Sequence, residues 1–127
     1  MSKIRSKKNR TTELRFLELL RAGNISGWRR HCERVFGHPD FVFMSQKLAI
    51  FVDGCFWHGC PKCYTAPWNN REYWAEKLVN NRKRDDVVRR TLRKRGYKVI
   101  RIWEHELKGK YHDRITKKIQ LAIAQAG

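Results

Sequence analysis

The stretch HPDFVFMSQKLAIFVD, residues 38–53, predicts a β-hairpin that forms the centre of the fold. Two runs of apolar and β-branched residues, FVF and KLAIFVD, flank a short polar turn at Ser45 and Gln46. Asp40 stands at the start of the first strand, and Asp53 ends the second. The hairpin therefore carries a carboxylate at an end of each strand.

A long helix and another strand are predicted downstream of this hairpin. Asn69 or Asn70 caps a basic helix that Gly96 ends. The positions that recur along it every three or four residues are Trp74, Leu78, Asn81, Asp85, Val88 and Leu92. YKVIRIW, residues 97–103, then predicts an apolar strand. Because a strand that follows a helix commonly lies beside its predecessor, we expect it next to residues 47–53.

Two more helices are predicted towards the ends of the chain. Thr11 or Thr12 caps the first, Glu13 lies in its first turn, and Gly23 ends it. Its apolar spacing comes from Leu14, Leu17 and Leu20. The closing helix spans about residues 113–125 and repeats Ile115, Ile119 and Ile123.

These elements predict one α/β domain, because 127 residues fit a single domain with a central mixed sheet flanked by helices. Residues 28–36 alternate loosely before the Gly37-His38-Pro39 turn. Residues 1–10 are basic and lack periodicity, so we expect a flexible arm that becomes ordered on a partner. The folded domain is then residues 11–127.

The charge of the chain indicates a polyanionic partner. Against 12 Asp and Glu stand 29 Lys and Arg, which leaves a net charge of +17. Charge alone fits a ribosome-associated or simply soluble basic protein equally well. No apolar run approaches the roughly 20 residues that span a bilayer. The N-terminus lacks the apolar region of a secretory signal, so we expect a reducing cytosol or nucleoid, with cysteines as thiols or metal ligands.

The cysteine-rich stretch after the hairpin indicates a zinc site. Cys55, Cys60 and Cys63 form C-x4-C-x2-C, and C-x2-C lets two thiolates hold one tetrahedral zinc. His105 is the best fourth ligand, because it follows a strand whose end can lie beside that of residues 47–53. His58 is nearer in sequence, and three thiols without metal are the alternative. Four protein ligands would leave zinc no open position for water, so its role would be structural.

Other residues must then supply any chemistry. Asp40, Asp53 and His58 are the candidates, because carboxylates near strand ends can bind Mg²⁺ while an imidazole transfers a proton. By spacing alone, a Pro-Asp pair before a strand is more often a simple turn.

Four segments in this order resemble the very-short-patch repair (Vsr) DNA endonucleases: HPDFVF, AIFVDGCFWHGCPKCY, NNREYWAEKLVNNRKRD and GYKVIRIWEHEL. The resemblance covers about residues 2–107, and DGCFWHGC is a highly specific string. It implies a fold similar to the restriction-endonuclease core. It also implies an enzyme that nicks one DNA strand beside a T·G mismatch.

The resemblance also implies roles for individual residues. Asp40 would be the essential Mg²⁺ ligand, helped by the main-chain carbonyl of Val52. His58 would act as a general acid or base, and Glu13 would assist from the first helix. Asp53 stands where some members have Asp and the best-known member has His, so it would bind metal or handle protons.

The remaining matches are the zinc ligands and three aromatic residues. Cys55, Cys60, Cys63 and His105 match the structural zinc set; in the best-known member the second and fourth ligand types are exchanged, which zinc accepts. Phe56, Trp57 and Trp74 match aromatics that enter the duplex beside the mismatch, although tryptophans on apolar faces are ordinarily core residues.

The leading interpretation is therefore a Mg²⁺-dependent, zinc-containing endonuclease in the bacterial cytoplasm. It would act as a monomer on mismatched duplex DNA, with mismatch-repair proteins as further partners. Two alternatives remain: a related homing or defence nuclease with another target, and a zinc-containing DNA-binding module without catalysis.

Overall fold

The computed structural model describes residues 2–54 and 69–126, which form a four-stranded sheet between helices. The strands are β1 (Arg29–Arg30), β2 (Phe41–Phe43), β3 (Leu48–Asp53) and β4 (Lys98–Trp103). They lie in the order β1-β2-β3-β4. The first two pairs are antiparallel and β3 pairs parallel with β4, which confirms the predicted mixed sheet and central hairpin.

The helices follow the sequence pattern closely at their C-terminal ends. They are α1 (Ser2–Ala22), α3 (Arg71–Lys94) and α4 (His112–Ala126), with the short 3₁₀ turns η1 (Glu104–Leu107) and η2 (Gly109–Tyr111) before α4. Asn70 precedes α3 as its N-cap residue, as predicted. Its side chain makes no capping hydrogen bond, and its φ of 58° lies in the left-handed region that Asn tolerates.

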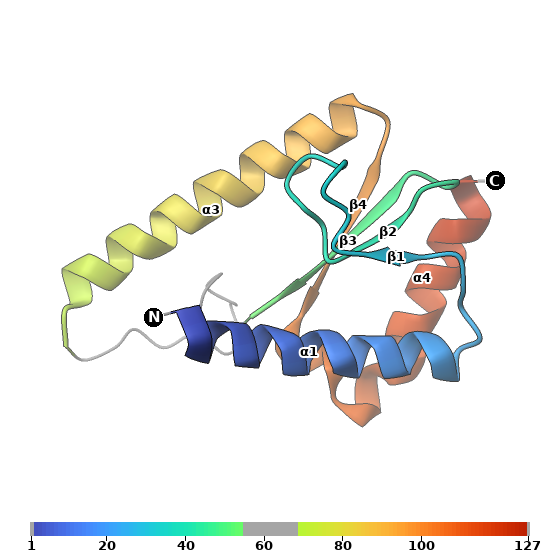
Figure 1. The fold of residues 1–127 in the computed structure, drawn as a ribbon, viewed down its shortest axis with the longest axis horizontal. Coiled ribbons are helices and arrows are strands. Elements are labelled where there is room, and N and C mark those ends of the chain that lie inside the picture. The colour runs from blue at the N-terminus through green and yellow to red at the C-terminus, as the bar shows by residue number, and fades with distance from the viewer. Residues whose placement is uncertain (1, 55–68, 127) are drawn as a thin grey trace.

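The two faces of the sheet bury separate cores because strand side chains alternate. Phe41, Leu48 and Ile100 point to one face, where they pack with residues of α1 and α4 such as Phe16 and Ile115. The opposite face packs against α3 through Val42, Ala49, Phe51, Val88 and Leu92. Figure 1 shows the resulting arrangement, with α3 on one side of the sheet and α1 and α4 on the other.

The first half of α3 extends beyond the sheet (Figure 1). Its buried residues are Asn81, Val88 and Leu92, whereas residues 71–80 are exposed or half-buried. A helix of 24 residues is roughly 36 Å long, longer than a six-residue strand of about 20 Å. The sheet therefore supports the second half of α3 and leaves its first half projecting.

The N-terminal region differs from its prediction. Helix α1 begins at Ser2, so the backbone of residues 2–10 is helical rather than irregular. No Gly or Pro interrupts residues 2–22, and Lys and Arg are good helix formers, so weak periodicity does not prevent a helix there. The helix also buries Phe16 and Leu17, whereas Leu14 is 43% exposed. The flexibility of the arm stays a prediction.

The loosely alternating residues 28–36 form only a short strand. Only Arg29 and Arg30 pair with β2, and turns occupy most of the following residues. His31 and His38 have positive φ values of 51° and 49°, which interrupt an extended backbone. The chain can therefore turn back towards Asp40 instead of continuing as an edge strand.

Candidate functional site

A cleft of about 270 Å³ opens where the ends of β2 and β3 meet α1 and α3. It collects side chains from segments far apart in the sequence, four of them acidic. Its lining residues include Glu13, Asp40, Asp53, Asn81, Asp85 and Arg101. The cleft is therefore the place where the predicted catalytic carboxylates come together.

Asp40 is fixed at this cleft by the hairpin itself. It directly precedes β2, and its Oδ2 accepts a hydrogen bond of 2.7 Å from the main-chain N–H of Val52, near the end of β3. Its main-chain carbonyl accepts a hydrogen bond from the N–H of His31 at 3.2 Å. Among the residues that the structure describes, Asp40 forms no ion pair.

The electrostatic surroundings of Asp40 are unfavourable to its charge. Burial raises the pKa of its carboxyl from 3.8 to about 6, against the opposing effect of the Val52 hydrogen bond. The carboxylates of Glu13 and Asp53 also raise the pKa, and His31 lowers it. Asp40 is therefore an acceptor whose charge a bound cation would stabilise.

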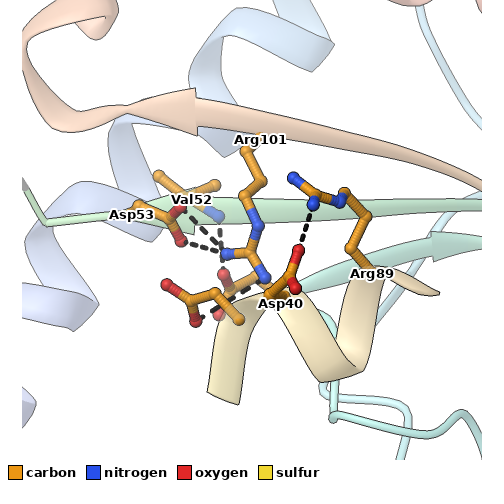
Figure 2. Close-up of polar contacts among 7 residues, drawn as sticks. Asp40, Val52, Asp53, Arg89 and Arg101 are labelled. Carbon is orange, nitrogen blue, oxygen red and sulfur yellow. Dashed lines mark hydrogen bonds and ion pairs between the residues drawn. The ribbon is translucent and has the colours of Figure 1, made fainter. Parts of the chain in front are cut away.

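Asp53 has a different environment, although it ends the neighbouring strand. Its two carboxylate oxygens each accept a 2.9 Å hydrogen bond from Nη1 of Arg101 on β4. Nη2 of the same guanidinium lies 3.6 Å from Oδ1 of Asp85 on α3. Figure 2 shows the guanidinium directed at Asp53, with Val52 and Asp40 beside it. A single arginine thus contacts two acidic side chains of the cleft.

Glu13 reaches the cleft from α1 and is itself partnered. Its Oε1 lies 2.7 Å from Nε2 of His31 and 3.5 Å from Nη2 of Arg30. Glu13 is buried, whereas the His31 side chain is 61% exposed. This pair places a group that can exchange protons with solvent beside a buried carboxylate.

The donor groups around Asp40 fit a hard divalent cation. In a strand, the N–H and C=O of one residue face the same neighbour, so the Val52 carbonyl is on the edge where its N–H meets Asp40. In residues 2–54 and 69–126, no three His, Cys, Asp or Glu side chains form a group that could hold a metal ion. A cation here would need the carbonyl, water and substrate oxygens, as Mg²⁺ usually does.

The structure thus describes only some of the predicted catalytic residues. Glu13, Asp40 and Asp53 line one cleft, and Val52 touches Asp40 through its N–H. His58 lies outside the described residues. The catalytic roles of all these residues, and the Mg²⁺ itself, stay predictions.

The predicted zinc site falls largely outside the described part of the chain, which omits Cys55, Cys60 and Cys63. Asp53 pairs with Trp103 in the parallel register, so the chain leaves β3 beside the place where β4 ends. His105 follows in η1, half-buried, with its ring 6.2 Å from that of Tyr111. The adjacency of the two strand ends is therefore confirmed, whereas the zinc stays a prediction.

The predicted wedge aromatics are also mostly beyond the described ranges. Phe56 and Trp57 lie outside them. Trp74 is half-buried near the start of α3, where its ring meets that of Tyr73 edge to face at 5.1 Å. It therefore belongs to the projecting half of the helix rather than to the core against the sheet.

The sequence interpretation missed Arg101 and His31 as site residues. Arg101 is a charge within the apolar run KVIRIW, which in a paired strand signals a polar contact on one face. His31 has no such signal, because its approach to Glu13 depends on the turn after β1. For Asp85, the spacing predicts only a position on the helix face.

Comparison with known proteins gives the same family as the motifs. The family model described as DNA mismatch endonuclease Vsr matches residues 1–65. The type II nicking enzyme V.NaeI of Lentzea aerocolonigenes is 48% identical over 68 residues, which are 54% of this chain and 41% of that enzyme. The DNA mismatch endonuclease Vsr of Escherichia coli (strain K12) is 40% identical over 78 residues, 58% of this chain and 48% of that protein.

A longer match is to the type II nicking enzyme V.HpaIIP of Haemophilus parainfluenzae. It is 32% identical over 104 residues, 76% of this chain and 69% of that enzyme. The first relatives are longer, and the chain spans less than two thirds of their length, 41% of V.NaeI and 60% of V.NmeAIP. By the family model and these matches, the chain belongs to the Vsr family of DNA mismatch endonucleases.

Proposed function

We propose that this protein is a divalent-metal-dependent DNA endonuclease that nicks one strand of duplex DNA beside a T·G mismatch. The observation that carries the proposal is Asp40, a half-buried carboxylate with a raised pKa and no ion-pair partner in the described chain, beside the Val52 main chain. The relatives named as nicking enzymes support strand nicking. The relative named as a mismatch endonuclease supports the mismatch.

The cleft supports a metal-assisted hydrolysis of the phosphodiester. Asp40 and the Val52 carbonyl would hold Mg²⁺, which when bound polarises the phosphate and favours ionisation of the attacking water. The Glu13–His31 pair lies where protons can be passed to solvent. His58 would serve as general acid or base, either taking a proton from the attacking water or giving one to the leaving oxygen. Asp53 belongs to the same site through Arg101.

The surroundings of the cleft support a duplex as substrate. The net charge of +17 favours binding to phosphates, and the projecting half of α3 presents Arg71 and Lys77 beyond the sheet. The helices on both faces of a mixed sheet support a restriction-endonuclease-like core. No helix in the described ranges is long and apolar enough to cross a bilayer.

We also propose one structural zinc, held by Cys55, Cys60, Cys63 and His105. The parallel register supports this set, because Asp53 at the end of β3 lies opposite Trp103 at the end of β4, so both strands end at the same edge of the sheet. Zinc bound there would connect the two strand ends that flank the cleft and so stabilise the position of Asp53.

The test is single-turnover nicking by an Asp40→Asn variant. The substitution removes the charge from a hard-cation site and nearly preserves shape, so we expect nicking to fall by at least about 10³-fold, whereas duplex binding is retained. Asp113→Asn, an exposed change in the first turn of α4, is the matched control and should nick as the parent does.

Each protein is assayed with Mg²⁺ on T·G-mismatched and matched duplexes of the same sequence. Undiminished nicking by Asp40→Asn would exclude Asp40 as the metal ligand. Equal nicking of both duplexes by the parent would favour the homing or defence nuclease. Binding without nicking on every duplex would favour the DNA-binding module without catalysis.

A further inference from the structure

Arg101 is held in one position by contacts on three sides. Its guanidinium donates to both oxygens of Asp53 at 2.9 Å, approaches Asp85 at 3.6 Å, and lies over the ring of Phe51 at 4.4 Å. Phe51 is also its partner in the β3–β4 register, so the contact follows from strand pairing. The side chain is only 22% exposed. Arg101 is therefore part of the cleft wall and not a mobile surface arginine.

The charges of the cleft divide into two kinds. Glu13 has Arg30 and His31 as partners, and Asp53 and Asp85 share Arg101. Asp40, in contrast, has no cationic ion-pair partner within the described chain. Asp40 is thus left for an external cation, whereas the other three acidic side chains already have an internal one.

An arginine in this position has a specific electrostatic consequence. Nucleases with two-metal sites hold the second divalent ion roughly 4 Å from the first, and carboxylate oxygens such as those of Asp53 and Asp85 are ligands suited to it. The guanidinium supplies a positive charge that contacts both carboxylates. It also occupies the space between Asp53 and Asp85.

We propose that Arg101 is a built-in cation that takes the place of a second divalent ion between Asp53 and Asp85, so that the cleft binds one metal ion, at Asp40. This inference rests on the proposed nuclease function and specifies the metal content of its site. Asp53 then positions Arg101 and is not itself a metal ligand. Arg101 is a positioning residue that sets the number and place of the ions.

The test is the number of Mn²⁺ ions bound per chain, read from the free Mn²⁺ signal in electron paramagnetic resonance titrations. Arg101→Met removes the charge and keeps much of the apolar stem on Phe51. It should bind one Mn²⁺ more than the parent, because Asp53 and Asp85 become available as oxygen ligands. Adding Asp53→Asn to Arg101→Met should remove the additional ion.

Two further variants serve as second measurement and control. Arg101→Gln also removes the charge but keeps a donor for Asp53, so it tests the inference even if the methionine variant does not fold. Arg114→Met removes an arginine that lies 3.8 Å from Glu106 on the α4 side, outside the cleft, and should leave the Mn²⁺ count unchanged. Mn²⁺ ions bound at other places do not affect the result, because the count for each variant is compared with the count for the parent.

The outcomes separate this inference from the proposed function. A parent that nicks DNA while Arg101→Met or Arg101→Gln, folded by circular dichroism, gains no Mn²⁺ would overturn the role of Arg101 and leave the nuclease intact. If the parent binds a second Mn²⁺ ion that is lost in Asp53→Asn, the role of Arg101 would also be overturned while the nuclease function remains. A parent that neither nicks nor binds Mn²⁺ at Asp40 would refute the proposed function itself.

Discussion

Two aspartates at the ends of adjacent hairpin strands have opposite electrostatic environments. Asp53 accepts two hydrogen bonds from Arg101, whereas Asp40 accepts one from the neutral main-chain N–H of Val52. An arginine favours the charged form of a carboxylate, and burial without a cation disfavours it. On the proposed function, an external cation would therefore bind at Asp40 rather than at Asp53.

The raised pKa of Asp40 predicts that its charge destabilises the metal-free protein at neutral pH. The folded pKa of about 6 exceeds the unfolded value of 3.8, so the folded state binds more protons between these values. Stability therefore falls as pH rises through this window. Asp40→Asn should raise the free energy of unfolding by about 1–3 kcal/mol at pH 8 and leave it nearly unchanged at pH 4.

Denaturant unfolding at both pH values, with chelator present, measures this effect. Asp113→Asn on α4 is the matched control and should show no such pH dependence. The same gain for Asp40→Asn at pH 4 and pH 8 would mean that the charge of Asp40 is not the cause.

At the scale of elements, the turn before β2 and the helix α3 together shape the cleft. Gly37 has a φ of +83°, and a Cβ built on it would lie 2.4 Å from Cγ1 of Val88. Val88 is one of the few buried side chains of α3. The absence of a side chain at Gly37 therefore lets the helix approach the turn that leads to Asp40.

Gly37→Ala should consequently destabilise the protein by about 2–4 kcal/mol, from left-handed backbone strain and overpacking against Val88. Gly27→Ala is the matched control, because its φ is +90° and its Cβ would meet nothing within 4 Å, so it should lose only about 1 kcal/mol. Thermal unfolding of both variants gives the comparison. Equal losses would show that contact with Val88 contributes nothing.

We expect the basic residues in the first half of α1 to contact DNA phosphates. The basic positions in its first half are Lys3, Arg5, Lys7, Lys8 and Arg10. Replacing them with Gln keeps helix propensity and removes charge, so the slope of log affinity against log salt should decrease by about 0.9 for each phosphate that is no longer neutralised. Replacing Lys117 and Lys118 on α4 is the control. An unchanged slope in the first variant would place the start of α1 away from DNA.

At the scale of the whole molecule, β3 and β4 end side by side, with Asp53 opposite Trp103. If zinc connects them through Cys55, Cys60, Cys63 and His105, elemental analysis should give one zinc per chain. Because metal binding and folding are coupled, a strong chelator should lower the unfolding temperature by several degrees or more. Cys32→Ser, which changes a cysteine outside this set, should keep the zinc. A folded protein without zinc would contradict the proposed set.

The sequence by itself determined the elements and the family. Short apolar, β-branched runs placed β2, β3 and β4, and the 3.6-residue spacing of Ile115, Ile119 and Ile123 placed α4, because strand propensity and helical periodicity are local properties of the chain. Asp40 and Asp53 were found because they stand at the ends of recognisable strands. The start of α1 was missed, since residues 2–10 carry no apolar stripe, although Lys and Arg are good helix formers.

Only the tertiary structure decided which charges meet. Arg101 and Asp53 are 48 residues apart, and the parallel register of β3 and β4 together with the α3 face brings them together. Glu13 and His31 meet because α1 packs under the sheet where the turn after β1 bends back. Ion-pair partners depend on distances in space, and local periodicity specifies which face a side chain occupies but not which charge lies opposite.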